Sequence, residues 1–302
     1  MKADLPLRLA LASNAAFSLT SALLMIFRPA VVGGWLGINV PLVLQIIGGG
    51  LVIFAAELIY QATRDRIVTW RALLASVADF SWVIGSIISL FALPQLFSPT
   101  GTTLVLAVAG AVLVFGAWQL WAAGRAHRIG VNGEHRHCII VETNAPTEKL
   151  WQVVGNIGDI KFYMPSLTRS LILEGKAPGV GAVRFCEDRS GKQWSEECIE
   201  FNPGRSFSVR FLSEAPNFPF PAKTMRGGWE VAPVTAGSRV MVWWELTPKN
   251  RLLAPAILPL LAFQADRDFP KIVRRMTAAA LADGSEAQTS GGAFARLLPG
   301  FC

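Results

Sequence analysis

Four apolar runs occupy most of the first 127 residues. They cover residues 9–27, 40–62, 72–93 and 102–123. A helix of about 20 apolar residues is long enough to cross the hydrocarbon core of a bilayer. Prolines stand at or near the ends of the runs, where they delimit helices without interrupting them. The pattern predicts four transmembrane helices.

Small residues recur inside the second and fourth of these runs. Gly and Ala allow two helix backbones to approach closely in a membrane bundle. The residues expected at such contacts are Gly48, Gly49, Gly50, Ala107, Gly110, Ala111 and Gly116.

From residue 137 the pattern changes to that of a soluble α+β domain. A β-rich run at 137–143 precedes a helical pattern that begins near Thr147. Six strand-like runs then alternate with Pro, Gly and Asn turns, at 170–176, 181–188, 192–201, 205–213, 223–232 and 238–247. Their short turns predict an antiparallel meander, and 192–201, with acids and apolar residues on both faces, is expected to contain a bulge. A long helix is predicted from about 252 to 283.

The distribution of charge supports this division. Residues 1–127 contain seven Lys and Arg and four Asp and Glu, against 21 and 17 in residues 128–302. We therefore predict a transmembrane domain at 1–127, a linker at 128–136, a soluble domain at 137–283 and a flexible tail at 284–302. The net charge of +7 is not concentrated in a basic cluster. This favours the lipid bilayer as a partner and argues against nucleic acid.

Basic residues near the ends of the runs predict the orientation. They lie before the first run, between the second and third, and after the fourth, whereas the two opposite loops contain only Arg28. The positive-inside rule then places both termini and the C-terminal domain in the cytoplasm. The expected location is the inner membrane of a bacterium.

Two acids, Glu57 and Asp79, interrupt the apolar runs. An acid within a span is a candidate for proton sharing or for binding a polar headgroup. The alternative is a structural role, in which each acid reaches the interface or stabilises helix packing. Arg64 and Arg71 are the nearest candidate partners.

The order of elements after residue 137 resembles the helix-grip fold of the START/Bet v 1-like (SRPBCC) superfamily, in its polyketide cyclase/dehydrase and lipid-transport branch. The resemblance lies in Ala145-Pro146 with Trp151, Gly158-Asp159 before Pro165, Gly179-Val180-Gly181-Ala182 leading into Val183-Arg184-Phe185, and Glu197 with Asn202-Pro203-Gly204. Tyr163-Met164 replaces the family's usual Trp before the turn proline. The resemblance covers about 137–283. It implies an antiparallel sheet wrapped on a long C-terminal helix, with a cavity for an apolar ligand.

Strand alternation separates an apolar face from a polar one. The apolar face is expected to line the cavity, with loop 214–222 near its mouth. The predicted ligand-binding residues are Phe162, Tyr163, Pro165, Val183, Phe185, Phe207, Val209, Phe211, Met225, Trp229, Val242 and Trp244. Phe162, Tyr163 and Pro165 are placed at the rim.

The sequence favours binding over catalysis. The soluble domain has no histidine after His137, and no Ser-His or Cys-His pair can be assembled within it. No catalytic residue, cofactor or metal is therefore predicted, although His135 and His137 lie beside Cys138. The expected function is membrane-tethered binding or transfer of a hydrophobic small molecule or lipid.

Two alternatives stay open. One is a membrane-anchored enzyme of cyclase or dehydratase type that uses Tyr163, Glu197, Arg210 and Glu245. The other makes the membrane bundle the functional part and the soluble domain an interaction module. The sequence leaves open the ligand, any reaction, the direction of transfer and whether the chain forms a homo-oligomer.

Overall fold

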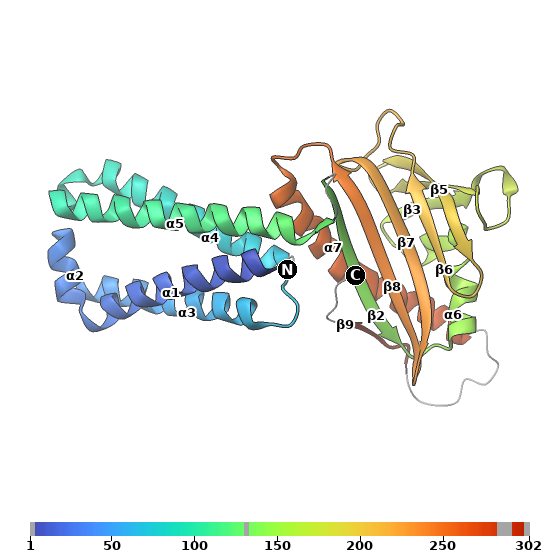
Figure 1. Cartoon of the computed structure of the whole chain (residues 1–302), viewed down its shortest axis with the longest axis horizontal. Coiled ribbons are helices and arrows are strands. Elements are labelled where there is room, and N and C mark those ends of the chain that lie inside the picture. The colour runs from blue at the N-terminus through green and yellow to red at the C-terminus, as the bar shows by residue number, and fades with distance from the viewer. Residues whose placement is uncertain (1–3, 130–132, 283–291, 299–302) are drawn as a thin grey trace. The chain divides into compact units, whose positions relative to one another are not determined.

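The computed structural model describes residues 4–129, 133–282 and 292–298 (Figure 1). The chain divides into two compact units. One comprises residues 1–127 with 253–260, and the other comprises residues 128–252 with 261–302.

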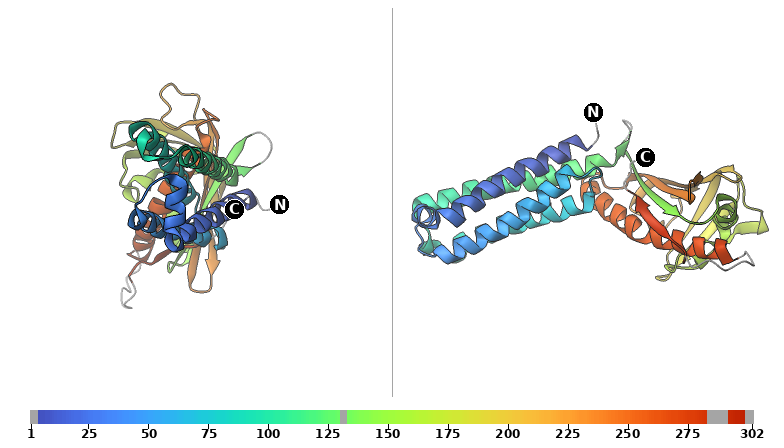
Figure 2. Two further views of the ribbon diagram at one scale, coloured as in Figure 1. Left: turned by 90° about the vertical axis from the view of Figure 1, so that its left-hand side faces the viewer. Right: turned by 90° about the horizontal axis from the view of Figure 1, so that it is seen from below.

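The N-terminal unit is a bundle of four long helices, as predicted. They are α1 (Leu5–Phe27), α3 (Pro41–Thr63), α4 (Thr69–Ala92) and α5 (Pro99–Ala126), and each is long and apolar enough to cross a membrane. Helix α1 packs along α3, and α4 packs along α5 (Figure 2). Two short elements in the connections, α2 (Pro29–Leu36) and the 3-10 helix η1 (Pro94–Leu96), were not predicted.

Arg8 ties the start of α1 to the end of α3. Its guanidinium donates to the carbonyls of Ala62, Arg64 and Asp65, at 2.7, 2.6 and 3.1 Å, and its Nε donates to Asp4 at 2.8 Å. The last carbonyls of a helix lack partners within the helix and carry the negative end of its dipole. A positively charged donor at this position therefore stabilises the end of α3.

Only some of the small residues lie where helices approach closely. A Cβ added to Gly48 would lie 2.8 Å from Ile26 on α1, and one added to Gly116 would lie 3.0 Å from the Cβ of Asp79 on α4. A Cβ on Gly49, Gly50 or Gly110 would meet no atom within 4 Å. The prediction of a close contact is therefore wrong for these three glycines.

Substitution of Gly116 tests this packing. We expect Gly116→Ala to lower the thermal stability of the bundle in mild detergent, because the new methyl group overlaps Asp79 and Phe80 of α4. Gly110→Ala on the same helix is the matched control and should be neutral or stabilising, since alanine is the better helix former. Equal melting temperatures for the two variants would contradict the packing described here.

The C-terminal unit is an antiparallel sheet with a long helix on one face. Its strands are β1 (Arg128–Ile129), β2 (Glu134–Thr143), β3 (Leu167–Ile172), β4 (Val183–Asp188), β5 (Gln193–Asn202), β6 (Ser206–Phe211), β7 (Ala222–Val234), β8 (Gly237–Pro248) and β9 (Ala295–Leu298). The helices are α6 (Thr147–Val154), the 3-10 turns η2 (Ile157–Phe162) and η3 (Leu173–Gly175), and α7 (Ala254–Ala282), of which the part from residue 261 onward belongs to this unit. This arrangement confirms the predicted helix-grip fold.

The strand order is β1-β2-β8-β7-β6-β5-β4-β3, and β9 also pairs with β2. Strands β3 to β8 form the predicted meander. The pairing of β5 with β6 shifts register between Cys198 and Glu200, where a bulge was expected. We call the sheet face that contacts α7 the inner face, and the opposite one the outer face.

Two segments are more ordered than predicted. The proposed linker at 128–136 contributes β1 and the first residues of β2. The proposed flexible tail contributes β9, which pairs Ala295–Leu298 with residues 140–143 of β2. Backbone pairing explains both differences, because short strands can gain order from a neighbouring strand without an apolar pattern of their own.

Candidate functional site

The inner face is built from alternate residues of the strands. Those of β6, β7 and β8 are largely apolar and buried: Phe207, Val209, Trp229, Val231, Val240, Val242, Trp244 and Leu246. Helix α7 adds Phe269, whose ring centre lies 5.6 Å from that of Trp229. The alternation of apolar and polar residues therefore predicted the inner face of these three strands correctly.

On β4 the prediction of the face is wrong. Arg184 and Cys186 are buried, whereas Val183 and Phe185 are half-buried. Directly opposed residues share a face in an antiparallel ladder. Arg184 pairs with Glu196, and Glu196 in turn with Phe211 of the inner face. Val183 and Phe185 therefore lie on the outer face, where the Arg169 guanidinium lies 5.4 Å from the Phe185 ring centre.

Arg184 forms a buried ion pair with Glu196 on the inner face. The side chains are 6% and 5% exposed. Arg184 Nη1 donates to the Ile157 carbonyl of η2 at 2.8 Å, and Trp194 Nε1 donates to Glu196 Oε1 at 2.7 Å. A buried ion pair is favourable only when further hydrogen bonds satisfy its remaining groups. These bonds do so, and they fix η2 to the sheet.

A second polar pair on this face joins β2 to α7. His137 Nε2 lies 2.9 Å from Asp266 Oδ1, and the side chains are 9% and 17% exposed. The His137 ring packs on Trp244 at 5.6 Å. The pair places an imidazole and a carboxylate within an otherwise apolar part of the inner face.

Aromatic rings gather beside the predicted entrance. Phe218 and Phe220, in the loop between β6 and β7, have ring centres 6.3 and 5.6 Å from that of Phe211. Trp194 lies 5.2 Å from Phe220. Phe211, Phe220 and Trp194 are half-buried. The loop thus continues the inner face with aromatic surface that is partly open to solvent.

Residues 139–281 match the family model for polyketide cyclase/dehydrase and lipid transport. Over this range the C-terminal unit is similar to that family. A comparison with curated protein sequences found no match.

Solved structures resemble the C-terminal unit at low sequence identity. Ara h 8.0201 is 17% identical, covers 49% of this chain and 99% of its own, and has a TM-score of 0.39. XoxI from Bacillus cereus is 19% identical, with coverages of 49% and 96% and a TM-score of 0.37. A protein from Thermobifida fusca is 18% identical, with coverages of 49% and 95% and a TM-score of 0.39.

The three residues predicted at the rim are accessible. Phe162 is 67% exposed, Pro165 is exposed and Tyr163 is half-buried. The Tyr163 carbonyl accepts a 3.1 Å hydrogen bond from Arg275 of α7. Met225 and Phe211 of the inner face are half-buried. Contact of all these residues with a ligand stays a prediction.

Three residues considered for catalysis form ion pairs on the sheet. Arg210 binds Glu197 at 2.9 Å and Glu214 at 3.1 Å, and Glu245 binds Arg136 and Arg226 at 3.0 and 2.9 Å. Glu197 and Arg210 oppose each other in the β5–β6 ladder, and Val183 opposes Glu197. They therefore lie on the outer face with Val183, which favours the stabilising role.

Sequence reasoning missed four polar residues of the inner face: His137, Asp266, Arg184 and Glu196. The sequence places His137 at the start of a β-rich run, where nothing indicates a partner, and it places Arg184 on the polar face of β4. The correct face of β4 could have been inferred only from the strand pairing. Arg184 lies opposite Glu196 in the β4–β5 hairpin, and Glu196 lies opposite Phe211 on β6. The contact between His137 and Asp266 joins residues 129 positions apart and leaves no local signal.

The two acids of the bundle have different partners. Glu57 forms a 2.9 Å ion pair with Arg71, one of the two predicted partners. Asp79 is buried and accepts hydrogen bonds from Asn14 and Gln119 at 2.9 and 2.8 Å. Because α4 begins at Thr69, Asp79 is its eleventh residue and lies about 15 Å along the helix.

The buried thiols of the domain should be unreactive. Burial, together with the nearby Glu196 carboxylate, raises the pKa of Cys186 to about 12, and burial also raises the pKa of Cys198. Since the thiolate is the nucleophile, we expect Cys186 to react with iodoacetamide at pH 8 at least ~1,000-fold more slowly than a free cysteine. Peptide mass spectrometry of the native and denatured chain measures this, and rapid native labelling of Cys186 would contradict the burial.

Proposed function

We propose that the C-terminal domain of this protein binds an apolar molecule between the inner face of the sheet and α7. The four N-terminal helices hold this domain at a membrane. The observation that supports the proposal most is the inner face itself, in a domain similar to the cyclase/lipid-transport family. Its aromatic and branched side chains offer apolar surface to a ligand, at about 25 cal/mol for each Å² removed from water.

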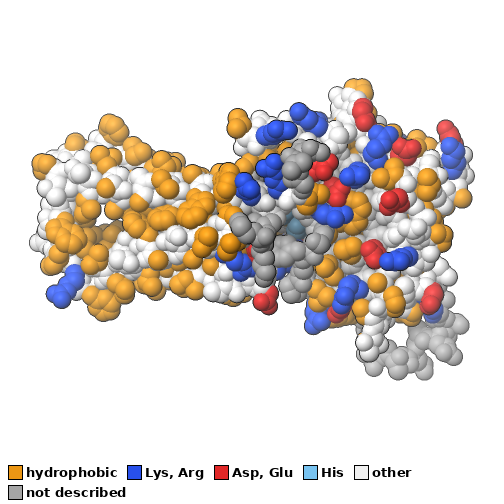
Figure 3. All heavy atoms as spheres, viewed as in Figure 1, with side chains coloured by type: hydrophobic (Ala, Val, Ile, Leu, Met, Phe, Trp, Pro, Cys, Tyr) orange, Lys and Arg blue, Asp and Glu red, His pale blue; other side chains and the backbone are white. Residues whose placement is uncertain are grey.

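The bundle supports tethering. Its exposed side chains include Phe27, Ile53 and Phe91, which are 72%, 74% and 84% exposed. Figure 3 shows apolar side chains over the visible surface of the bundle, whereas acidic and basic side chains are frequent on the C-terminal unit. Exposed apolar surface of this extent is typical of contact with lipid. Tethering raises the effective concentration of the domain beside the bilayer. The basic flanks favour a cytoplasmic position for it.

The aromatic loop between β6 and β7 provides the entrance in this proposal. Phe211 lies at the end of the inner face and contacts Phe218 and Phe220 of the loop. An apolar ligand that reaches the inner face here would pass over these rings. The aromatic rings would replace water around the ligand and slow its release.

A matched pair of phenylalanines tests the proposal. The full chain is purified in mild detergent, co-purifying lipids are identified by mass spectrometry, and the variants Phe211→Ala and Phe185→Ala are compared. Both phenylalanines are half-buried, but Phe211 belongs to the inner face and Phe185 to the outer. We expect Phe211→Ala to lower the bound amount about tenfold, the effect of losing part of an aromatic contact. Phe185→Ala should not change it.

Two results would overturn binding on the inner face. One is the absence of any co-purifying apolar compound, together with no uptake when a fluorescent phospholipid is added. The other is an equal loss in both variants. Circular dichroism of each variant shows whether the sheet has been retained.

An enzymatic role is the second candidate, and the partly buried His137–Asp266 pair is the observation that favours it. A carboxylate that orients an imidazole can make it a general base. If the domain converts its ligand, His137→Asn should retain binding but accumulate the unconverted compound. The mass spectrum of the co-purified molecule would then differ between the variant and the unsubstituted protein. Identical spectra would rule out this role for His137.

A further inference from the structure

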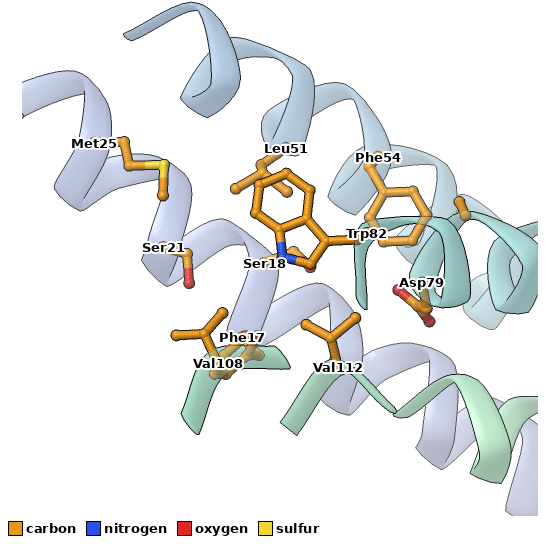
Figure 4. A pocket seen from close by; sticks show the side chains of 11 residues that line it. Phe17, Ser18, Ser21, Met25, Leu51, Phe54, Asp79, Trp82, Val108 and Val112 are labelled. Carbon is orange, nitrogen blue, oxygen red and sulfur yellow. The ribbon is translucent and has the colours of Figure 1, made fainter. Parts of the chain in front are cut away.

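A cavity of about 160 Å³ lies within the four-helix bundle (Figure 4). All four long helices line it. Phe54, Trp82 and Val112 are among its apolar walls, and Ser18, Ser21 and Asp79 are its polar members. Met25 lies toward one end and the Asp79 carboxylate toward the other. An engineered apolar cavity of about 150 Å³ binds benzene, so this one has room for a ring-sized group.

Asp79 makes the cavity chemically distinct from a packing defect. Asp79 as a whole is only 4% exposed to solvent. Asn14 Nδ2 and Gln119 Nε2 both donate to the same oxygen, Oδ2, and Ser18 Oγ donates to Asn14 Oδ1 at 3.2 Å. Among the described residues, Asp79 Oδ1 has no hydrogen-bond partner. One carboxylate oxygen is therefore held by the bundle, and the other is left for a ligand.

We propose that this cavity binds the hydroxyl end of an apolar alcohol, with Asp79 Oδ1 as its polar partner. The two amide donors require Oδ2 to act as an acceptor, so any proton on the carboxyl group resides on Oδ1. Oδ1 is then an acceptor in the ionised form and a donor in the protonated form. A hydroxyl group can donate to the first and accept from the second. An apolar body attached to it matches Phe54, Trp82 and Val112.

A pair of ligands that differ only in the hydroxyl group tests the proposal. The full chain in mild detergent is photolabelled with a benzyl alcohol that carries a diazirine, and the labelled residues are mapped by peptide mass spectrometry. We expect labels on lining residues such as Phe54, Trp82 and Met25. Benzyl alcohol should protect them at concentrations about tenfold lower than toluene, the usual effect of one hydrogen bond to a charged group. Equal protection by the two compounds would overturn the proposal.

Three variants locate the site. Asp79→Leu should abolish the preference for benzyl alcohol over toluene. Val112→Phe fills the cavity and leaves Asp79 with its partners, so it should remove the labels even where Asp79→Leu impairs folding. Glu57→Gln is the matched control, since Glu57 is the other acid of the bundle, does not line the cavity and pairs with Arg71. Labelling that persists in Val112→Phe would place the probe elsewhere and refute the site.

A free alcohol and the hydroxyl group of a membrane lipid share this chemistry. Repeating the protection in phosphatidylcholine nanodiscs with dioleoylglycerol separates them. Protection by dioleoylglycerol assigns the site to a lipid hydroxyl, and protection by benzyl alcohol alone assigns it to a free alcohol. Phe211→Ala should not affect labelling of the bundle, so this site and the proposed inner-face site can fail independently.

Discussion

Removing the charge of Arg184 should destabilise the β4–β5 hairpin by about 3–5 kcal/mol, the usual cost of leaving one member of a buried ion pair alone. In Arg184→Met, Glu196 would keep only the Trp194 indole as a donor, and the Ile157 carbonyl would lose its partner. Hydrogen exchange measured by mass spectrometry on the full chain reports the local opening free energy of both strands and of η2. The exchange of all three should accelerate together.

Glu197 provides the control because it is the next residue on the same strand. Its pair with Arg210 lies on the outer face, where the two side chains are 36% and 42% exposed. Glu197→Gln should therefore cost less than about 1 kcal/mol. Adding Glu196→Gln to Arg184→Met should recover part of the loss, since a neutral amide can still accept from Trp194. Similar costs for Arg184→Met and Glu197→Gln would mean that the Arg184 pair is effectively solvated.

The fold was predictable because its signals are local. Four runs of about 20 apolar residues define the bundle helices, and α1, α4 and α5 begin three or four residues before their runs, whereas α3 is shifted by one residue. Turn residues separate the strands of the meander, and alternation oriented β6, β7 and β8 correctly. Strand β9 was missed because its order comes from pairing with β2, a distant segment.

The polar parts of both candidate sites were harder to predict because burial is not a property of a single residue. Arg184 occupies a polar position in the alternating pattern of β4, and a charged side chain is expected to face water. Its burial is tolerated only because Glu196 lies opposite it and Trp194 and Ile157 complete the hydrogen bonds. Asp79 was recognised as unusual, but its partners Asn14 and Gln119 come from helices 65 and 40 residues away. Such contacts become visible only after the helices are packed.

The turn between β7 and β8 should be among the least tolerant positions of the domain. Gly237 has a φ of 138°, and a Cβ added to it would lie 2.1 Å from the Thr143 carbonyl oxygen and 2.8 Å from the Asn144 Cα. Gly237→Ala should cost about 1–2 kcal/mol for the backbone conformation. The overlap with the end of β2 should add about 1–3 kcal/mol. Hydrogen exchange of β2 and β8, measured by mass spectrometry on the full chain, provides the test.

Gly204, in the turn between β5 and β6, separates the cost of the backbone conformation from the cost of the steric overlap. Its φ is 78°, but a Cβ there would meet no atom within 4 Å. Gly204→Ala should therefore show only the backbone cost, with faster exchange confined to β5 and β6. In Gly237→Ala the loss should also reach Ser238, whose hydroxyl donates to the Ala145 carbonyl at 2.6 Å. Equal costs for the two variants would show that the end of β2 can move aside. The inner face of β2, where His137 meets Asp266, would then be less rigidly placed than the contacts of Gly237 imply.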